Sequence, residues 1–225
     1  MIIFRSLIFN LLFFTMSLMI GTLFLPLLIS KSWTIRISHI WALITIYLLK
    51  IICKVEINIE NLEKFYKKQV LFAVRHESVL ETILFLAYFP NIKYILKKEL
   101  LYIPFYGFFV WRCGHIIIDR NARAKTIFLM LKKIKSNLIE KESLVLFPHG
   151  TRVKPLSNIR IKPGIYAIYK NLNIPIVPVY MSTGHIWDRR GFIKRPGKIK
   201  VCTSEYIESG YNRVDFLKLL NSKLN

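Results

Sequence analysis

VLFAVRHESVLETILFLAYF, residues Val70–Phe89, joins two kinds of apolar pattern through one polar turn. Its first five residues, Val70–Val74, are all apolar, which predicts a short buried strand. The segment Ser78–Phe89 predicts a helix with Ser78 as its N-cap. The turn between them carries His76. A buried strand followed directly by a helix is the unit from which α/β sheets are built.

The same alternation continues along most of the chain. Further strands are predicted at residues 55–60, 92–96, 115–119, 143–147, 174–181 and 198–205, and further helices at 121–140, 164–170 and 214–224. Strands that alternate with helices favour an α/β sheet covered by helices on both faces. In such sheets ligands bind in the loops at the strand ends.

The N-terminal part of the chain has a different pattern. Leu7–Ser30 carries no charge over 24 residues, which is enough for a helix that spans a bilayer, and a second apolar stretch follows at Ile37–Leu49. Basic residues flank every end, so they give no orientation. A true span and a hairpin that enters one leaflet, bent at Pro26, both fit; a buried soluble helix pair fits less well because the first stretch has no polar face. We therefore expect a membrane-embedded hairpin at 1–54 and an α/β domain at 55–225.

Composition narrows the function classes. Lys and Arg total 34 against 13 Asp and Glu, giving a formal net charge of +21, while 53% of the residues are hydrophobic. A basic and apolar chain suggests a protein that lies on anionic lipid. A nucleic-acid binder is not favoured, because the aromatic residues do not interleave with a basic stripe. The cysteines Cys53, Cys113 and Cys202 are far apart, so we expect neither a metal site nor a disulfide framework.

His76 and Glu81 are the first candidates for chemistry. They are five residues apart, with His76 in the loop before the predicted helix. Glu81 could reach back to the imidazole, fix its tautomer and raise the basicity of the other nitrogen, as a general base requires. Alternatively, Ser78 and Glu81 form a capping box that bonds the backbone at the helix start. The spacing alone favours the capping box.

Two later loops carry cations. In LVLFPHGTRVKP, residues Leu144–Pro155, Gly150 bends the chain after a strand and Arg152 can face the same sheet edge as Arg120, which follows another strand. A guanidinium beside backbone amides suits a phosphate. Lys98 could bring a further cation, although each of these residues could also be an ordinary surface charge. Together with one base, the set suits a small phosphorylated acceptor whose hydroxyl loses a proton.

Several blocks, in this order and spacing, resemble the glycerolipid acyltransferase family, and most closely its bacterial 1-acyl-sn-glycerol-3-phosphate acyltransferases. The blocks are HESVLE, KKELLYIPFYG, GHIIIDR, FPHGTR and IPIVPVY, and the resemblance covers about residues 70–200. It implies a mixed sheet covered by helices, with an apolar N-terminal hairpin. It also implies acyl transfer to lysophosphatidic acid, giving phosphatidic acid without a covalent enzyme intermediate. The donor would be an acyl thioester of acyl carrier protein or coenzyme A, no cofactor would be bound, and the domain would lie on the cytoplasmic side of the cell membrane.

The resemblance also implies roles for individual residues. His76 would be the general base, oriented by Glu81, where the family usually has Asp. The residues implied in binding substrate, through the phosphate, the loop that holds it or the acyl pocket, are Lys98, Arg120, His149, Gly150, Thr151, Arg152 and Pro178.

His149 departs from the family pattern, which usually has Glu in this block. Neutral imidazole offers one donor and one acceptor, and protonated imidazole would add positive charge. His149 could keep a contact with the acceptor hydroxyl with altered pH dependence, mark a different acceptor, or mark weak activity. We favour the first, because His76, Arg120 and Arg152 are retained. Other acceptors, such as glycerol 3-phosphate or a lyso-aminolipid, and a non-catalytic protein that binds anionic membrane lipid, remain as alternatives.

Overall fold

The strands of the computed structural model form one mixed sheet. The structure describes residues 1–65, 68–119, 124–138, 142–155, 157, 159–172, 174–189 and 191–224. Within them, a seven-stranded sheet has the order β1-β7-β6-β2-β5-β3-β4. Its strands are β1 Val55–Glu60, β2 Leu71–Val74, β3 Lys93–Lys97, β4 Ile116–Ile118, β5 Leu144–Leu146, β6 Ile176–Met181 and β7 Gly197–Thr203. The pair β6 and β7 is antiparallel and the other neighbours are parallel, which confirms the mixed α/β class.

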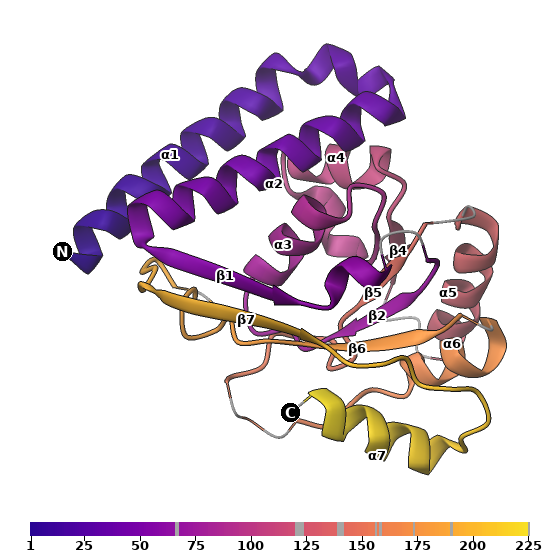
Figure 1. Ribbon diagram of the computed structural model, residues 1–225. Helices are drawn as coiled ribbons and strands as arrows, with labels where there is room; N and C mark the ends of the chain where they lie inside the picture. The colour runs from indigo at the N-terminus through magenta and orange to yellow at the C-terminus, as the bar shows by residue number, and fades with distance from the viewer. Residues whose placement is uncertain are drawn as a thin grey trace.

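Helices cover both faces of this sheet (Figure 1). Their bounds are α1 Ile2–Leu23, η1 Leu25–Ile29, α2 Lys31–Cys53, η2 Leu62–Phe65, α3 Leu80–Tyr88, η3 Lys98–Tyr102, α4 Tyr106–Arg112, α5 Ala124–Asn137, α6 Gly164–Leu172 and α7 Arg213–Leu224. One apolar cluster packs α1, α2, α3 and α4 on one face, and a second packs α5, α6 and α7 on the other. The central strands β2 and β5 are buried at every residue, as their continuously apolar sequences require, whereas β1 and β7 alternate between buried and more exposed positions.

The two N-terminal helices form a hairpin on the first of these faces. Helix α1 ends at Leu23, and Pro26 lies in the first turn of the short 3-10 helix η1 that leads to α2. Helix α2 packs between α1 and the body of the protein, where the His39 Nδ1 atom lies 3.0 Å from the Leu86 carbonyl oxygen of α3. Both helices are long and apolar enough to cross a membrane, and α1 exposes Phe4 and Phe14. These features suggest membrane association.

The buried Lys194, in the segment just before β7, is hydrogen-bonded to helix α1. Lys194 Nζ donates to Asn10 Oδ1 at 2.5 Å and to the Phe192 carbonyl at 3.0 Å. It also lies 4.3 Å from the ring centroid of Trp187. Burial lowers the pKa of Lys194 to about 8. Burying a charged lysine costs free energy unless its N–H groups are hydrogen-bonded. Asn10 of α1 accepts one of these hydrogen bonds.

Helix α4 was not predicted from the sequence. Apart from Arg112 at its end, the large side chains of this helix are all apolar or aromatic, so they show no helical period. Pro104 and Gly107 also interrupt the pattern. The structure shows why both interruptions are tolerated. The chain turns at Phe105, which has a φ of 60°, and a Cβ at Gly107 would lie 1.9 Å from the Leu101 carbonyl oxygen. Gly107 thus allows the close approach that starts the helix.

Candidate active site

The site lies where β2 and β5 end. These strands are parallel neighbours in register, Ala73 opposite Leu146, so the loops that follow them emerge at the same sheet edge. Val153 N donates to the His76 carbonyl at 2.7 Å. The His76 ring stacks on Phe147, with centroids 3.8 Å apart and planes at 19°. The two loops that the sequence singled out are therefore joined by backbone and by ring contact.

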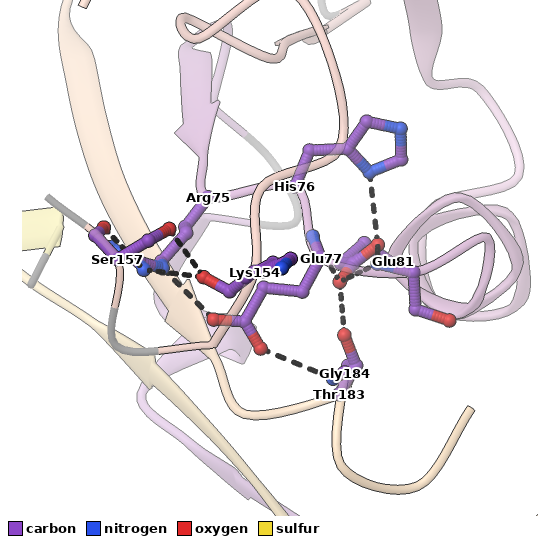
Figure 2. A network of polar contacts seen from close by, with 9 residues as sticks. Arg75, His76, Glu77, Glu81, Lys154, Ser157, Thr183 and Gly184 are labelled. Carbon is purple, nitrogen blue, oxygen red and sulfur yellow. Dashed lines mark hydrogen bonds and ion pairs between the residues drawn. The ribbon is translucent and has the colours of Figure 1, made fainter. Parts of the chain in front are cut away.

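The carboxylate of Glu81 holds His76. Its Oε2 atom lies 3.0 Å from His76 Nδ1, with Glu81 fully buried and the His76 side chain 15% exposed. Because a carboxylate accepts hydrogen bonds, Nδ1 is the donor, which leaves Nε2 as the basic nitrogen. Figure 2 shows this second nitrogen pointing away from Glu81. The geometry is that of an imidazole oriented for proton transfer.

The same carboxylate also bonds the start of α3. Its oxygens accept the backbone N–H groups of Glu77 at 3.0 Å and of Ser78 at 2.9 Å. One carboxylate thus contacts both His76 and the Ser78 N–H, so the two roles that the spacing set against each other are combined, although Ser78 does not complete a capping box. Ser78 is not the N-cap that we predicted, because α3 begins at Leu80 with Val79 as its N-cap. Ser78 Oγ instead accepts the Leu80 N–H at 3.2 Å, in a turn before the helix.

A third loop completes the surroundings of Glu81, and it was not predicted from the sequence. The Thr183 hydroxyl, just after β6, donates to Glu81 Oε1. Beside it, Gly184 N donates to Glu77 Oε2 at 3.1 Å. A Cβ at Gly184 would lie 2.8 Å from a ring atom of Pro155, so this loop is tightly packed under the site. Neither residue stands in a recognisable motif, and only the fold brings them here.

Arg75 and Glu77 form a buried ion pair next to this network, which the sequence also did not predict. Arg75 Nε donates to Glu77 Oε1 at 2.9 Å, and the side chains are 2% and 1% exposed. Arg75 Nη2 donates to the carbonyls of Lys154 at 3.3 Å and Ser157 at 3.0 Å. Figure 2 shows how the pair ties the His76 loop to the loop after β5. Such a pair is held by its extra hydrogen bonds as much as by its charges.

His149 lies beside this pair and is almost fully buried, at 2% exposure. Its Nδ1 atom has no hydrogen-bond partner among the residues that the structure describes. Burial, with the positive charge of Arg75 and the neighbouring His76, lowers the pKa of His149 to about 4. The ring is therefore neutral near pH 7 and adds no positive charge to the site.

The remaining part of the loop gathers cations. Gly150 has a φ of 72°, and a Cβ there would meet the Lys162 side chain at 3.1 Å. The half-buried Arg152 donates from Nη1 to the Arg189 carbonyl at 2.8 Å, and Arg189 Nη2 lies 3.5 Å from the Thr151 hydroxyl. Burial lowers the pKa of Arg152, and the charge of Glu81 opposes that change, so the guanidinium lies within electrostatic reach of the His76 network. Lys162 and Arg189 are additions that the sequence did not single out.

Two of the other predicted residues make contacts elsewhere, and a third lies outside the described residues. Lys98 is exposed and pairs with Asp119 at 3.3 Å. Arg120 lies outside the residues that the structure describes. Pro178 is buried within β6, opposite Ala73 of β2. Within the described residues, no group of three or more His, Cys, Asp or Glu side chains could hold a metal ion.

Comparisons with known proteins agree on one family. A family model described as Acyltransferase matches residues 56–182. The chain is 28% identical over 201 residues to the 1-acyl-sn-glycerol-3-phosphate acyltransferase of Pseudomonas aeruginosa, covering 88% of this chain and 78% of that protein. It is 37% identical over 127 residues to the enzyme of the same name from Helicobacter pylori, covering 56% of this chain and 53% of that protein. The alignment to the second relative thus spans about half of its length.

The fold is also found in a solved structure. The crystal structure of the 1-acyl-sn-glycerophosphate acyltransferase from Thermotoga maritima superposes with a TM-score of 0.79 at 15% identity. The match covers 99% of this chain and 94% of that one. The shared fold therefore includes the N-terminal hairpin as well as the sheet.

Proposed function

As a member of the acyltransferase family, this chain is an O-acyltransferase, and we propose that it transfers an acyl chain to the free hydroxyl of 1-acyl-sn-glycerol 3-phosphate, giving phosphatidic acid. The observation that carries the proposal is the His76–Glu81 pair beside a cluster of cations at one sheet edge. A base and an anion site are what acylation of a phosphorylated alcohol requires. The relatives bearing that enzyme name support the choice of acceptor.

In the proposed reaction His76 acts as general base. Its Nε2 atom takes the proton of the acceptor hydroxyl while Nδ1 stays bonded to Glu81. The freed oxygen attacks the thioester carbonyl, a C–O bond forms, the C–S bond breaks, and the proton passes from His76 to the departing thiolate. No covalent enzyme intermediate is needed. Ser78 is fully buried and its Oγ accepts a backbone N–H, which fits a structural role better than that of a nucleophile.

The acceptor phosphate is assigned to the cations of the loop after β5. Arg152 uses Nη1 for the Arg189 carbonyl, and a guanidinium has five N–H donors, so others remain for an anion. Gly150 and Thr151 shape this loop, and Arg120 and Lys98 join it by their positions in the family pattern. Neutral His149 offers the acceptor hydroxyl a hydrogen bond without charge. Pro178 is assigned to the wall of the acyl or acceptor pocket on the family pattern alone.

The donor in this proposal is the acyl thioester of acyl carrier protein or coenzyme A, with no bound cofactor. The hairpin at 1–54 holds the α/β domain at 55–225 on the cytoplasmic side of the cell membrane, where such donors are made. The exposed apolar residues of α1 and α2 support the membrane association in this proposal. A membrane location suits the chemistry, since the acyl chains of acceptor and product both partition into a bilayer.

The test is acyl transfer by the purified protein in detergent, with labelled acyl-coenzyme A and acyl carrier protein as donors. The acceptors are lysophosphatidic acid, glycerol 3-phosphate and lysophosphatidylethanolamine. We expect product with lysophosphatidic acid, and a loss of roughly 10²–10⁴-fold in His76→Ala. The matched control is His185→Ala, because His185 is exposed and lies outside the Glu81 network.

Each other outcome has a definite meaning. Product with glycerol 3-phosphate or the lyso-aminolipid alone would keep the chemistry and replace the acceptor. Equal rates in wild type and His76→Ala would remove His76 as the base. No product from any acceptor, together with vesicle binding that falls with salt, would support the non-catalytic lipid-binding alternative.

A further inference from the structure

A second apolar surface lies next to the hairpin, on α4 and the turn before it. Tyr102 is 72% exposed, Ile103 45%, Phe108 46% and Trp111 60%. On the opposite side of the same helix Val110 is buried in the core. Large aromatic side chains that face outward from a helix anchored on its other side mark a contact surface rather than part of the core.

This surface is continuous with the hairpin turn. Arg112 Nε, at the end of α4, donates to the Leu28 carbonyl at 2.8 Å. At the start of α4, a Cβ on Gly21 would lie 3.2 Å from Phe105 Cβ. Both ends of α4 are thus fixed to the hairpin, and Figure 1 shows α4 next to the turn between α1 and α2. In that turn, Ile29 of η1 is 81% exposed. The exposed apolar face of the turn runs on into α4.

Helix α4 also reaches the candidate active site. Val110 of α4 belongs to the same buried apolar cluster as Phe147, whose ring stacks on His76. The Tyr106 phenol also lies within electrostatic reach of Arg152, on the loop that we assign to the acceptor phosphate. With seven residues, the helix is roughly 10 Å long. It therefore bridges the catalytic edge of the sheet and the hairpin turn.

We propose that α4 and the Tyr102–Ile103 turn form a second membrane contact, which lies in the headgroup layer of an anionic bilayer and lets the lysolipid acceptor pass from the membrane to His76. The residue types fit, because Trp and Tyr are enriched at membrane interfaces. The charge fits as well: Arg112 lies at the end of α4, Lys31 lies next to Gly114 just beyond it, and the chain carries +21. Anionic lipid attracts such a surface, whereas a second copy of a molecule this basic repels it. The delivery step rests on the proposed function; the membrane contact does not.

The membrane contact is tested with an environment-sensitive dye at position 108. The full chain carries Phe108→Cys and Cys202→Ser, since Cys53 and Cys113 are buried and Cys202 is partly exposed. The matched control carries Phe128→Cys, because Phe128 is also exposed but lies on α5, which packs on the other face of the sheet. Vesicles of phosphatidylglycerol and phosphatidylcholine are then added, with and without chain-brominated lipid.

We expect a blue shift at position 108, quenching by brominated lipid and no change at position 128. No shift at position 108 would overturn the membrane contact. A shift that depends on protein concentration and occurs without lipid would overturn it in favour of a second copy.

Delivery is tested by activity with the double variant Phe108→Asp/Trp111→Asp. The acceptors are a long-chain lysophosphatidic acid in vesicles and a short-chain one that is soluble below its micelle concentration. We expect a loss of at least about tenfold with the vesicle acceptor and little change with the soluble one. Phe128→Asp is expected to match wild type with both. Equal loss with both acceptors would overturn the delivery step. If wild type acylates neither acceptor, the proposed function fails, and the dye still decides the membrane contact.

Discussion

The two loops that meet at the site are built differently. In the loop after β2 and the first turn of α3, the buried side chains of Arg75, Glu77 and Glu81 all have hydrogen-bond partners. In the loop after β5, the buried Nδ1 of His149 has none among the described residues, and Arg152 is only half-buried. The first loop is preorganised before any ligand arrives, whereas the second leaves polar groups for a ligand to satisfy. In the function that we propose, the first loop positions the base and the second recognises the acceptor.

The largest effect is expected from a substitution that disrupts the loop after β2. Glu77→Gln leaves the buried Arg75 guanidinium without its charge partner, so we expect the free energy of unfolding to fall by about 3–5 kcal/mol, measured by urea denaturation. The matched control is Glu56→Gln, because Glu56 forms an exposed pair with Lys198 at 3.2 Å and should change stability by less than about 1 kcal/mol. Similar small losses in both variants would show that the Arg75–Glu77 pair does not stabilise the loop.

A second prediction concerns the open loop and pH. The folded-state pKa of His149 is lowered from 6.5 to about 4, so the unfolded chain binds a proton more readily than the folded one between these values. Stability should therefore fall as pH drops from about 6.5 towards 4, by up to roughly 3 kcal/mol from this group. The His149→Gln variant has no titrating group at this position, so its free energy of unfolding should fall less than that of the wild type between pH 7 and 4.5. Parallel pH curves for wild type and variant would contradict the buried neutral ring.

The third prediction divides the two contacts of Glu81. Glu81→Gln can still accept backbone N–H groups but removes the negative charge that supports a protonated His76. We expect kcat to fall by roughly tenfold to a hundredfold, with a loss of stability of only about 1 kcal/mol. Thr183→Val removes one donor to the carboxylate and should lower kcat less, by a few-fold. If Glu81→Gln kept the wild-type rate, the carboxylate would be a capping group only.

The sequence predicted what depends on neighbouring residues. The alternation of strands and helices follows local patterns, and element bounds agree to within a few residues, as for the helix predicted at 78–89 and found at Leu80–Tyr88. His76 and Glu81 are near each other in the chain, so their contact could be proposed. The choice between base and cap could not be made, because one carboxylate with two oxygens serves both.

What the sequence missed depends on tertiary structure. Thr183 is 102 residues from Glu81 and follows a strand with no motif around it. Arg75 and Glu77 look like surface charges in the sequence, and their burial depends on contacts with the distant residues Lys154, Ser157 and Gly184. Helix α4 has no polar face, since the hairpin covers part of it and its aromatic side chains face outward, so no helical period marks it.

The anchor of α1 has a consequence for how the protein is made. Asn10 and Lys194 are 184 residues apart, and a ribosome releases the N-terminal end first. The strand β7 and the segment that carries Lys194 do not yet exist when α1 and α2 emerge. During most of translation, the hairpin therefore lacks its contacts with the Lys194 segment, and its apolar surface stays exposed. A nascent chain whose apolar hairpin is made long before the segment that packs against it is prone to aggregate in water. Early insertion of the hairpin into a bilayer would prevent this until the last strand is synthesised.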